Sequence, residues 1–360
     1  MKKRLGRLAV GGLFILAGVA TVPRAAAQPI PIRVVVVTTF ELGQDTGDVP
    51  GEFQTWVERY PLTGKLPFPQ GYRTLRYNQA DQVLGIVTGV GKSHAAASIM
   101  ALGMDPRFDL SRAYWILAGI AGINPAKGSV GSAAWANYAV DGDLAYEIDG
   151  REIPPNWSTG IVPNDRATPY EQPVPTEQSI GGVQLYHLND GLTGWAYHLT
   201  ADTHLPDDAT LKAVRAGYPT YPNAQKPPFV LQGDTLTADR FWIGTKMTAW
   251  GEQWVDYWTK GKGTSVTSAE EDTGYLQALT MLAQAKRVDF ARVMDLRTAS
   301  DYELPPQGKT AAQLLASEAH NELSGYKESL ESAYLVGRRV VKELAQHWNR
   351  YADRVPAFAK

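Results

Sequence analysis

The stretch RVVVVTT, residues 33–39, decides the fold class of this chain. Four consecutive valines are typical of a strand that is buried on both faces, as the strands of a parallel sheet are. Further strands are predicted at 83–88, 115–120, 128–138, 228–232 and 289–296. Helices are predicted at 95–102, with Ser93 as N-cap, at 271–285, and at 310–348 with a break near 324–325. This alternation of strands and helices predicts a three-layer αβα fold around a central mixed sheet.

Composition narrows the classes of protein to which the chain can belong. Its 360 residues include no cysteine, which excludes disulfides, cysteine nucleophiles and zinc–cysteine sites. A formal net charge of −2 gives no sign of a nucleic-acid partner. The six histidines show no HxxxH or HxH spacing, so we expect neither a metal site nor a resident cofactor.

The first 27 residues are predicted to form a secretory signal peptide of the bacterial kind. They begin with basic residues, continue with an apolar run from Leu8 to Val22, and end in three alanines at 25–27. We therefore expect cleavage after Ala27 and export to a periplasm, and an uncleaved membrane anchor is the alternative. No later segment has 18 consecutive apolar residues, so no transmembrane span is expected in the mature chain.

The remaining residues, 28–360, are predicted to form a single α/β domain. Two stretches, near 41–76 and 149–227, do not follow the alternation of strands and helices. They are rich in Gly, Pro and aromatic or polar residues, and we interpret them as insertions on the surface of the domain.

Chemically reactive residues are concentrated where the predicted strands end, the edge at which α/β sheets bind their ligands. Glu41 follows the first strand, and RTASD, residues 297–301, follows the last. TGVGK (88–92), GIAG (119–122) and QGDT (232–235) lie at the ends of three other strands, and EEDTG (270–274) begins a helix.

In this order, the segments resemble those of nucleoside phosphorylases and nucleosidases. Residues 297–301 resemble the Arg-x-x-Ser-Asp pattern of that superfamily. Residues 271–274, EDTG, match the Met-Glu-Asp-Thr-Gly segment of its fungal purine nucleoside permeases, with Glu270 where those proteins have Met. The chain is therefore identified as a member of the purine nucleoside permease family, and a phosphorylase-like fold is expected.

The resemblance implies that Asp301 is a catalytic acid, oriented by Ser300 and Arg297. The corresponding Asp of the superfamily donates a proton to N7 of the purine, which makes the base a better leaving group. General-acid catalysis of this kind contributes roughly 10²–10⁴-fold. The alternative from the residues alone is that Ser300 or Asp301 is only the N-cap of a following helix.

The resemblance also implies that Glu271 accepts hydrogen bonds from the 2′- and 3′-hydroxyls of ribose, with Asp272 beside it. A carboxylate has two oxygens and can accept both vicinal hydroxyls. The alternative is a solvated acidic helix start, which the helix dipole favours in any protein.

The remaining substrate-binding candidates lie in the glycine-rich turns and near the expected position of the base. Glycine turns present backbone N–H groups to a ligand, although they also occur as plain packing turns. Trp242 is expected to stack on the purine, whereas core packing is the favoured interpretation of Phe241. The other candidates are Gly89, Gly91, Lys92, Gly119, Ile120, Ala121, Gly122 and Asp234.

The co-substrate is left open by the sequence. Residues 115–118 lack the arginine that phosphorylases use against phosphate, and Ile120 replaces a phosphate-binding Ser, so hydrolysis is favoured. Glu41 is then the carboxylate expected to place the water. Phosphorolysis with inorganic phosphate is the alternative, with Arg73, Arg76 or Lys92 as substitute ligands.

A rival hypothesis comes from a different class of function. The chain would be a non-catalytic protein that binds purine nucleosides and takes part in their transmembrane transport, as the family label suggests. Proteins of related fold form dimers, trimers and hexamers, so the sequence leaves a homo-oligomer open.

Overall fold

The computed structural model describes residues 28–176, 182–318 and 324–358, so the predicted signal peptide lies outside the described residues. The strands are β1 (Ile30–Pro31), β2 (Val34–Thr38), β3 (Gly64–Leu66), β4 (Leu75–Asn78), β5 (Val83–Val87), β6 (Phe108–Asp109), β7 (Tyr114–Ile123), β8 (Ala133–Ala136), β9 (Tyr138–Asp141), β10 (Ala145–Glu147), β11 (Ile161–Pro163), β12 (Leu185–His187), β13 (Val230–Gln232), β14 (Asp234–Thr237), β15 (Ser265–Ala269) and β16 (Val293–Tyr302). The helices are α1 (Gln54–Arg59), α2 (Lys92–Gly103), α4 (Asp190–Thr200), α5 (Ala209–Ala216), α6 (Thr245–Thr259), α7 (Asp272–Gln284), α8 (Ala311–Glu318), α9 (Tyr326–Gln346) and α10 (Trp348–Tyr351), and Phe290–Arg292 forms a 3₁₀ turn.

A single large sheet forms the middle of the molecule. Its longest path runs β12-β9-β14-β15-β7-β2-β5-β4-β3, and β16 pairs with β7 and leads on to β8 and β13. The central strands β5, β2, β7 and β16 are parallel, whereas β15 is antiparallel to β7 and β4 to β5. The sheet is therefore mixed, as predicted.

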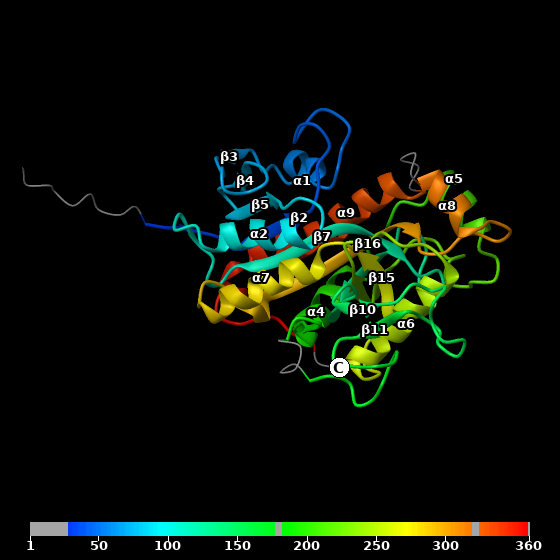
Figure 1. Ribbon diagram of the computed structural model, residues 1–360. Coiled ribbons are helices and arrows are strands. Elements are labelled where there is room, and N and C mark those ends of the chain that lie inside the picture. Colours follow the sequence, from blue (N-terminus) through cyan, green and yellow to red (C-terminus); the bar gives the residue numbers. More distant parts are fainter. Residues whose placement is uncertain (1–27, 177–181, 319–323, 359–360) are drawn as a thin grey trace, which may run out of the picture.

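The valine strand β2 shows why the sheet has helices on both sides. Val34 and Val36 contribute to one hydrophobic cluster with residues of α1, α4 and α9. Val35 and Val37 contribute to a second cluster with residues of α2 and α7, because successive side chains of a strand point to opposite faces. Helices α2 and α7 lie side by side over the sheet, and α9 runs along the other face (Figure 1). This arrangement confirms the three-layer αβα fold.

Several predicted boundaries are wrong, among them the start of the last strand, which is Val293 and not Asp289. The stretch 128–138 is a turn followed by two short strands, β8 and β9, because the chain changes pairing partners at Asn137. The last strand does not end at Arg297 but runs to Tyr302, paired along its length with β7. Ser93 does not cap α2; Gly91 is the N-cap and has no side chain to accept a bond, and Asp239 accepts from Lys92 N instead.

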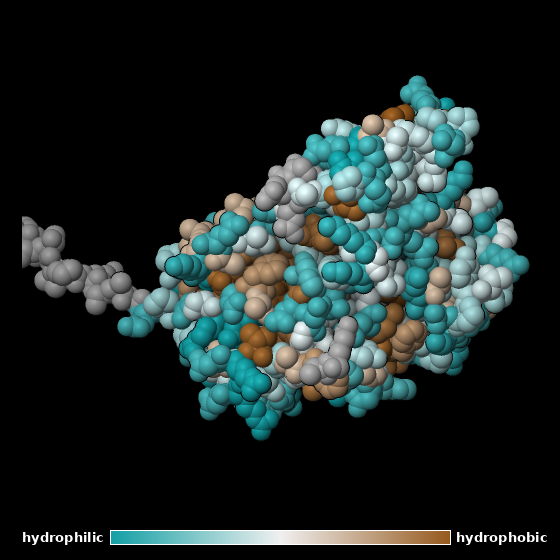
Figure 2. All heavy atoms as spheres, turned by 90° about the horizontal axis from the view of Figure 1, so that it is seen from below, coloured by the Kyte–Doolittle hydropathy of each residue, from teal (hydrophilic) through white to brown (hydrophobic). Residues whose placement is uncertain are grey.

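The two predicted insertions carry secondary structure of their own. The first contributes α1, β3 and part of β4, and the second contributes β11, β12, α4 and α5. On the face seen in Figure 2, apolar residues form several small groups separated by polar ones. Within the described residues, no helix is both long enough and apolar enough to cross a membrane.

Candidate functional site

A cavity of about 570 Å³ opens at the carboxyl ends of β2, β7 and β16 and beside β15. This is the edge of an α/β sheet at which ligands bind. Its lining comprises Thr39, Phe40, Leu42, Val49, Glu52, Val90, Ile120, Ala121, Gly122, Phe241, Ser268, Ala269, Glu270, Glu271, Ser300, Asp301 and Tyr326. Four of these side chains are carboxyls, and they come from segments far apart in the sequence.

Asp301 reaches the cavity because of an irregularity in β16. Ala299 pairs with Ala121 and Asp301 with Gly122, so Ser300 is an extra residue that forms a β-bulge. The bulge allows consecutive residues, Ser300 and Asp301, to face the same cavity. Both lie within a strand, so neither is a helix N-cap.

The Asp301 carboxyl is enclosed and has one strong partner. Ser300 Oγ donates to Asp301 Oδ1 over 2.7 Å, as predicted for an orienting residue. Burial raises the pKa of Asp301 to about 6, against which the hydrogen bond from Ser300 acts. A substantial fraction of Asp301 therefore stays protonated up to a pH of about 6, and this fraction can act as a general acid.

Arg297 does not orient Asp301, contrary to the prediction. Its side chain is 1% exposed and donates to Asp272 Oδ1 (2.7 Å), Glu271 Oε2 (2.9 Å) and the Ile120 carbonyl (3.0 Å). The two carboxylates belong to the start of α7, so Arg297 fixes that helix against β7 and β16.

Within this ion cluster, Glu271 and Asp272 have different positions. Glu271 lines the cavity, and its Oε1 also accepts from Gly91 N. Asp272 points away from the cavity, and its second oxygen accepts from the hydroxyls of Thr235 and Thr237. Asp272 is thus a support of the site and not part of its lining.

Glu52, and not Glu41, supplies the carboxylate beside the first strand. Glu52 Oε2 accepts from Thr39 N (2.6 Å) and Thr39 Oγ1 (2.8 Å), and Oε1 accepts from Ile120 N (2.7 Å). Burial raises the pKa of Glu52 to about 7, although the charge of Arg297 acts against this rise. Glu52 was not predicted from the sequence as a site residue.

Glu41 has a structural function instead. Its two oxygens accept four backbone N–H groups, from Leu42, Gly51, Phe53 and Gln54. These bonds close the loop 42–51 and satisfy free donors at the start of α1. Because both oxygens are occupied and the side chain does not line the cavity, the prediction that Glu41 places a water loses its geometric basis.

Positions 119 and 122 require glycine because neighbouring side chains lie too close for a Cβ atom. A Cβ at Gly119 would lie 2.6 Å from Arg297 Nη1 and 2.9 Å from Glu52 Oε1. A Cβ at Gly122 would lie 2.8 Å from Ser268 Oγ and 3.3 Å from Asp301 Oδ2. The absence of side chains here lets β7 pass directly between the carboxyl groups, while Ile120 and Ala121 form the wall.

The turn at 89–92 lies beside the cavity but serves mainly the protein itself. Gly89 and Gly91 have φ of 91° and 88°, which favours glycine. The N–H of Gly91 is directed to Glu271. Lys92 Nζ lies 2.9 Å from both Asp141 and Asp143, and the side chain is not part of the lining.

The predicted base-binding residues are placed differently from one another. Asp234 is buried and accepts from the backbone of Asn137, Tyr138 and Thr264, so it holds strands together outside the cavity. Trp242 lines only a small adjoining hollow of about 20 Å³ and packs edge-on against Trp250. Phe241, for which core packing was favoured, is 49% exposed and lines the cavity itself.

Glu270 is the fourth carboxyl of the lining. Burial and the neighbouring charge of Glu271 raise its pKa to about 7. None of the described residues that line the cavity carries a cationic side chain. The Arg297 guanidinium is already bound by two carboxylates and a carbonyl, and Arg240, in the small adjoining hollow, is paired with Asp143 and Glu147. The cavity is therefore acidic.

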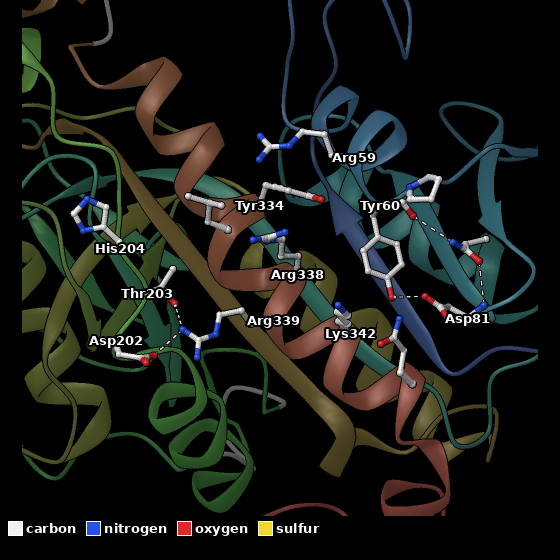
Figure 3. A pocket seen from close by; sticks show the side chains of 14 residues that line it. Arg59, Tyr60, Asp81, Asp202, Thr203, His204, Tyr334, Arg338, Arg339 and Lys342 are labelled. Carbon is white, nitrogen blue, oxygen red and sulfur yellow. Dashed lines mark hydrogen bonds and ion pairs between the residues drawn. The ribbon is translucent and has the colours of Figure 1, made fainter.

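A larger hollow of about 760 Å³ lies elsewhere, against α9 (Figure 3). Four cationic side chains line it: Arg59, Arg338, Arg339 and Lys342. Two of them are paired, Arg339 with Asp202 and Arg59 with Glu331. The hollow is not lined by the carboxyl ends of β2, β7 or β16 and contains none of the predicted site residues, so the smaller acidic cavity is the candidate site.

Comparison with known proteins agrees with this architecture. A family model described as purine nucleoside permease matches residues 31–356. The chain belongs to the purine nucleoside permease family. A probable purine nucleoside permease of Schizosaccharomyces pombe is 33% identical over 284 residues, which cover 77% of this chain and 80% of that protein. The purine nucleoside permease of Candida albicans is 28% identical over 332 residues, 91% of this chain and 78% of the relative. The family membership predicted from the sequence is thus confirmed.

Solved structures show which fold the family has. A 5′-methylthioadenosine/S-adenosylhomocysteine nucleosidase of Helicobacter pylori superposes with a TM-score of 0.52 at 12% identity, over 88% of this chain and all of that one. Futalosine hydrolase of the same organism gives a TM-score of 0.50 at 10% identity, over 86% and 98%. The chain has the nucleoside phosphorylase/nucleosidase fold, with additional segments.

Proposed function

We propose that this chain binds purine nucleosides and hydrolyses their N-glycosidic bond. The observation that carries the proposal is the meeting of Asp301, Glu271 and Glu52 in one acidic cavity at the strand ends. The names of the relatives support purine nucleosides as ligands, and the likeness to nucleosidases supports the fold on which such a site is built.

Asp301 acts on the leaving group. A purine leaves poorly as an anion, and transfer of the Asp301 proton to N7 lets it leave as a neutral base. The bond between N9 and C1′ breaks, and its electron pair goes to the purine. A pKa raised to about 6 keeps enough of the acid form present for this step.

Glu271 and Glu52 act on the sugar and the water. Glu271 is fixed by Arg297 and Gly91 and still has lone pairs free to accept hydrogen bonds from ribose hydroxyls. Glu52, held by Thr39 and Ile120, takes a proton from the water that attacks C1′. The products are the purine and free ribose; Glu52 then gives its proton to solvent, and solvent returns a proton to Asp301.

The acidic lining favours water over phosphate as the co-substrate. A phosphate site needs cationic or N–H donors. The three substitutes considered from the sequence are all engaged outside the cavity: Arg73 and Arg76 with Asp45, and Lys92 with Asp141 and Asp143. A phosphate ion in the cavity would instead lie among carboxylates.

The rival function is capture of nucleosides for transport without cleavage, which the name of the family favours. The Asp301 carboxyl separates the two hypotheses. Full enclosure of a carboxyl costs desolvation energy, and a binding protein gains little from an acid beside a leaving group.

The experiment is incubation of the purified protein with inosine or adenosine, with and without phosphate, followed by chromatography. We expect free base and ribose, without ribose 1-phosphate, at the same rate in both buffers. Asp301→Asn should lower the rate by roughly 10²–10⁴-fold while nucleoside still binds. Asp353→Asn, a change of an 89% exposed carboxylate, is the control that should retain full activity. Tight binding of intact nucleoside by the wild type would overturn hydrolysis and favour the carrier.

A further inference from the structure

Glu270 has no function in the scheme above, although it lines the cavity. It follows β15 and directly precedes Glu271, the proposed ligand of the sugar. It also lines the small adjoining hollow, together with Asp301. The side chain of Glu270 therefore lies on the wall that connects the sugar end of the site to the leaving-group end.

The Glu270 carboxyl is free for a ligand. Within the described part of the chain it makes no hydrogen bond and no ion pair, whereas the Glu52 and Glu271 carboxyls are held by two or more protein donors or charges. The charged groups near it are Glu271, Arg297, Asp239 and Asp143, and three of these four are acidic. Arg297 is already bound by Glu271 and Asp272. Arg240, which shares the small hollow with Glu270, is paired with Asp143 and Glu147.

We propose that Glu270 is a catalytic residue whose carboxylate stabilises positive charge on the sugar ring during cleavage. The inference rests on the proposed hydrolysis. When the purine takes the electron pair of the bond between N9 and C1′, the sugar is left with a positive charge shared by C1′ and the ring oxygen. A fixed negative group beside the sugar interacts with this charge only as it develops, so it lowers the barrier more than it strengthens binding.

The position of Glu270 in the chain supports a specific function for this carboxylate. A carboxyl here has a cost, because it is partly buried next to Glu271, and that cost raises its pKa to about 7. Positive charge on a bound sugar would offset this cost.

The test compares Glu270→Gln, which keeps the shape of the side chain, with Glu270→Met, which replaces the carboxyl by an apolar side chain of similar length. We expect kcat for inosine to fall by about tenfold or more in both variants, with KM changed less than about threefold. The control is Asp239→Asn, which changes an exposed acid near Glu270 that lies outside the lining. Asp239 accepts from Lys92 N through Oδ1, an interaction that Asn retains, so this variant should behave like the wild type.

A second measurement does not depend on turnover. A purine linked to a protonated pyrrolidine carries the positive charge that the sugar acquires, and a neutral nucleoside does not. We expect Glu270→Gln to weaken binding of the cationic compound by about tenfold or more and to leave binding of the neutral nucleoside within about threefold.

The outcomes separate the two proposals. Unchanged kcat and unchanged affinity for the cationic compound in both Glu270 variants would overturn the role of Glu270 and leave the hydrolysis intact. If the wild type releases no base, the proposed hydrolysis fails, and the proposed role of Glu270 fails with it. In that case, weaker binding of the cationic compound by Glu270→Gln than by the wild type would still show that Glu270 interacts with positive charge at the position of the sugar.

Discussion

The pH dependence of cleavage follows directly from the surroundings of Asp301 and Glu52. Burial raises the pKa of Asp301 to about 6 and that of Glu52 to about 7. Hydrolysis requires a proton on Asp301 and none on Glu52, so only sites with one proton on the pair are active. Below pH 6 both carboxyls are protonated and no base is available for water. Above pH 7 both are ionised and no acid is available for the purine.

The expected size of the effect can be worked out from these two values. The fraction of sites with a single proton is largest near pH 6.5, at about 60%, and falls to about 3% near pH 4.5 and near pH 8.5. In the Glu270→Gln variant, which lacks the third titrating carboxyl with a pKa of about 7, kcat/KM should therefore fall about 20-fold over two pH units on either side of its maximum. Because the pKa values differ by about one unit, the single proton lies on Asp301 in about one site in ten, which lowers the maximum but not the shape of the curve.

The assay is the initial rate of base release from inosine between pH 4.5 and 9 at constant ionic strength. In the Glu270→Gln background, Glu52→Gln should lower the maximum and remove the acid limb, leaving a single fall near pH 6 as Asp301 ionises. A profile that stays flat from pH 5 to 8.5 in an active enzyme would refute the assignment of acid and base to this pair.

Three further predictions concern stability and can be measured by urea denaturation. Arg297→Met leaves two buried carboxylates without their cation and should lower the free energy of unfolding by about 3–5 kcal/mol; no loss would show that the ion cluster is not formed. Glu41→Gln removes acceptors from the start of α1 and should cost about 1–2 kcal/mol while kcat stays unchanged, whereas loss of catalysis in a folded variant would restore Glu41 as a candidate base. Burial raises the pKa of Glu303 and Glu318 to about 8, above their values in the unfolded chain. The free energy of unfolding should therefore be higher at low pH and decline as pH rises from 5 to 8.5. Glu303→Gln should make this decline smaller.

Much of the fold could be predicted because its central strands are nearly pure apolar runs. Residues 33–39 and 83–88 became β2 and β5 within one residue at each end. The end of β16 could not be predicted, because Arg297, Ser300 and Asp301 are polar yet completely enclosed. Polar residues inside a strand give the same pattern as a turn, and only the partner strand β7 shows that the ladder continues.

The site residues could be predicted where a sequence motif lines the cavity. They could not be predicted where a loop brings a later residue back to the end of a strand. Asp301, Ser300, Glu271 and residues 120–122 meet in the cavity. Glu41 was favoured because it follows β2 directly, but the loop 42–51 brings Glu52 back to Thr39. No local signal marks that return, since it depends on the bonds that Glu41 makes to the loop. Lys92 and Asp234 are close in sequence to ligand-binding turns, but both are occupied by partners within the protein.

The extra residue in β16, Ser300, determines to which face of the sheet the side chain of Asp301 points. In a regular ladder, neighbouring side chains alternate between the two faces of the sheet, and the bulge at Ser300 lets Ser300 and Asp301 share one. In a strand of the same length without the bulge, the aspartate would pair with Ile123 instead of Gly122 and would point to the opposite face of the sheet. Among distant relatives, the pairing register of this strand with β7 is therefore as informative about chemistry as the identity of the carboxyl group.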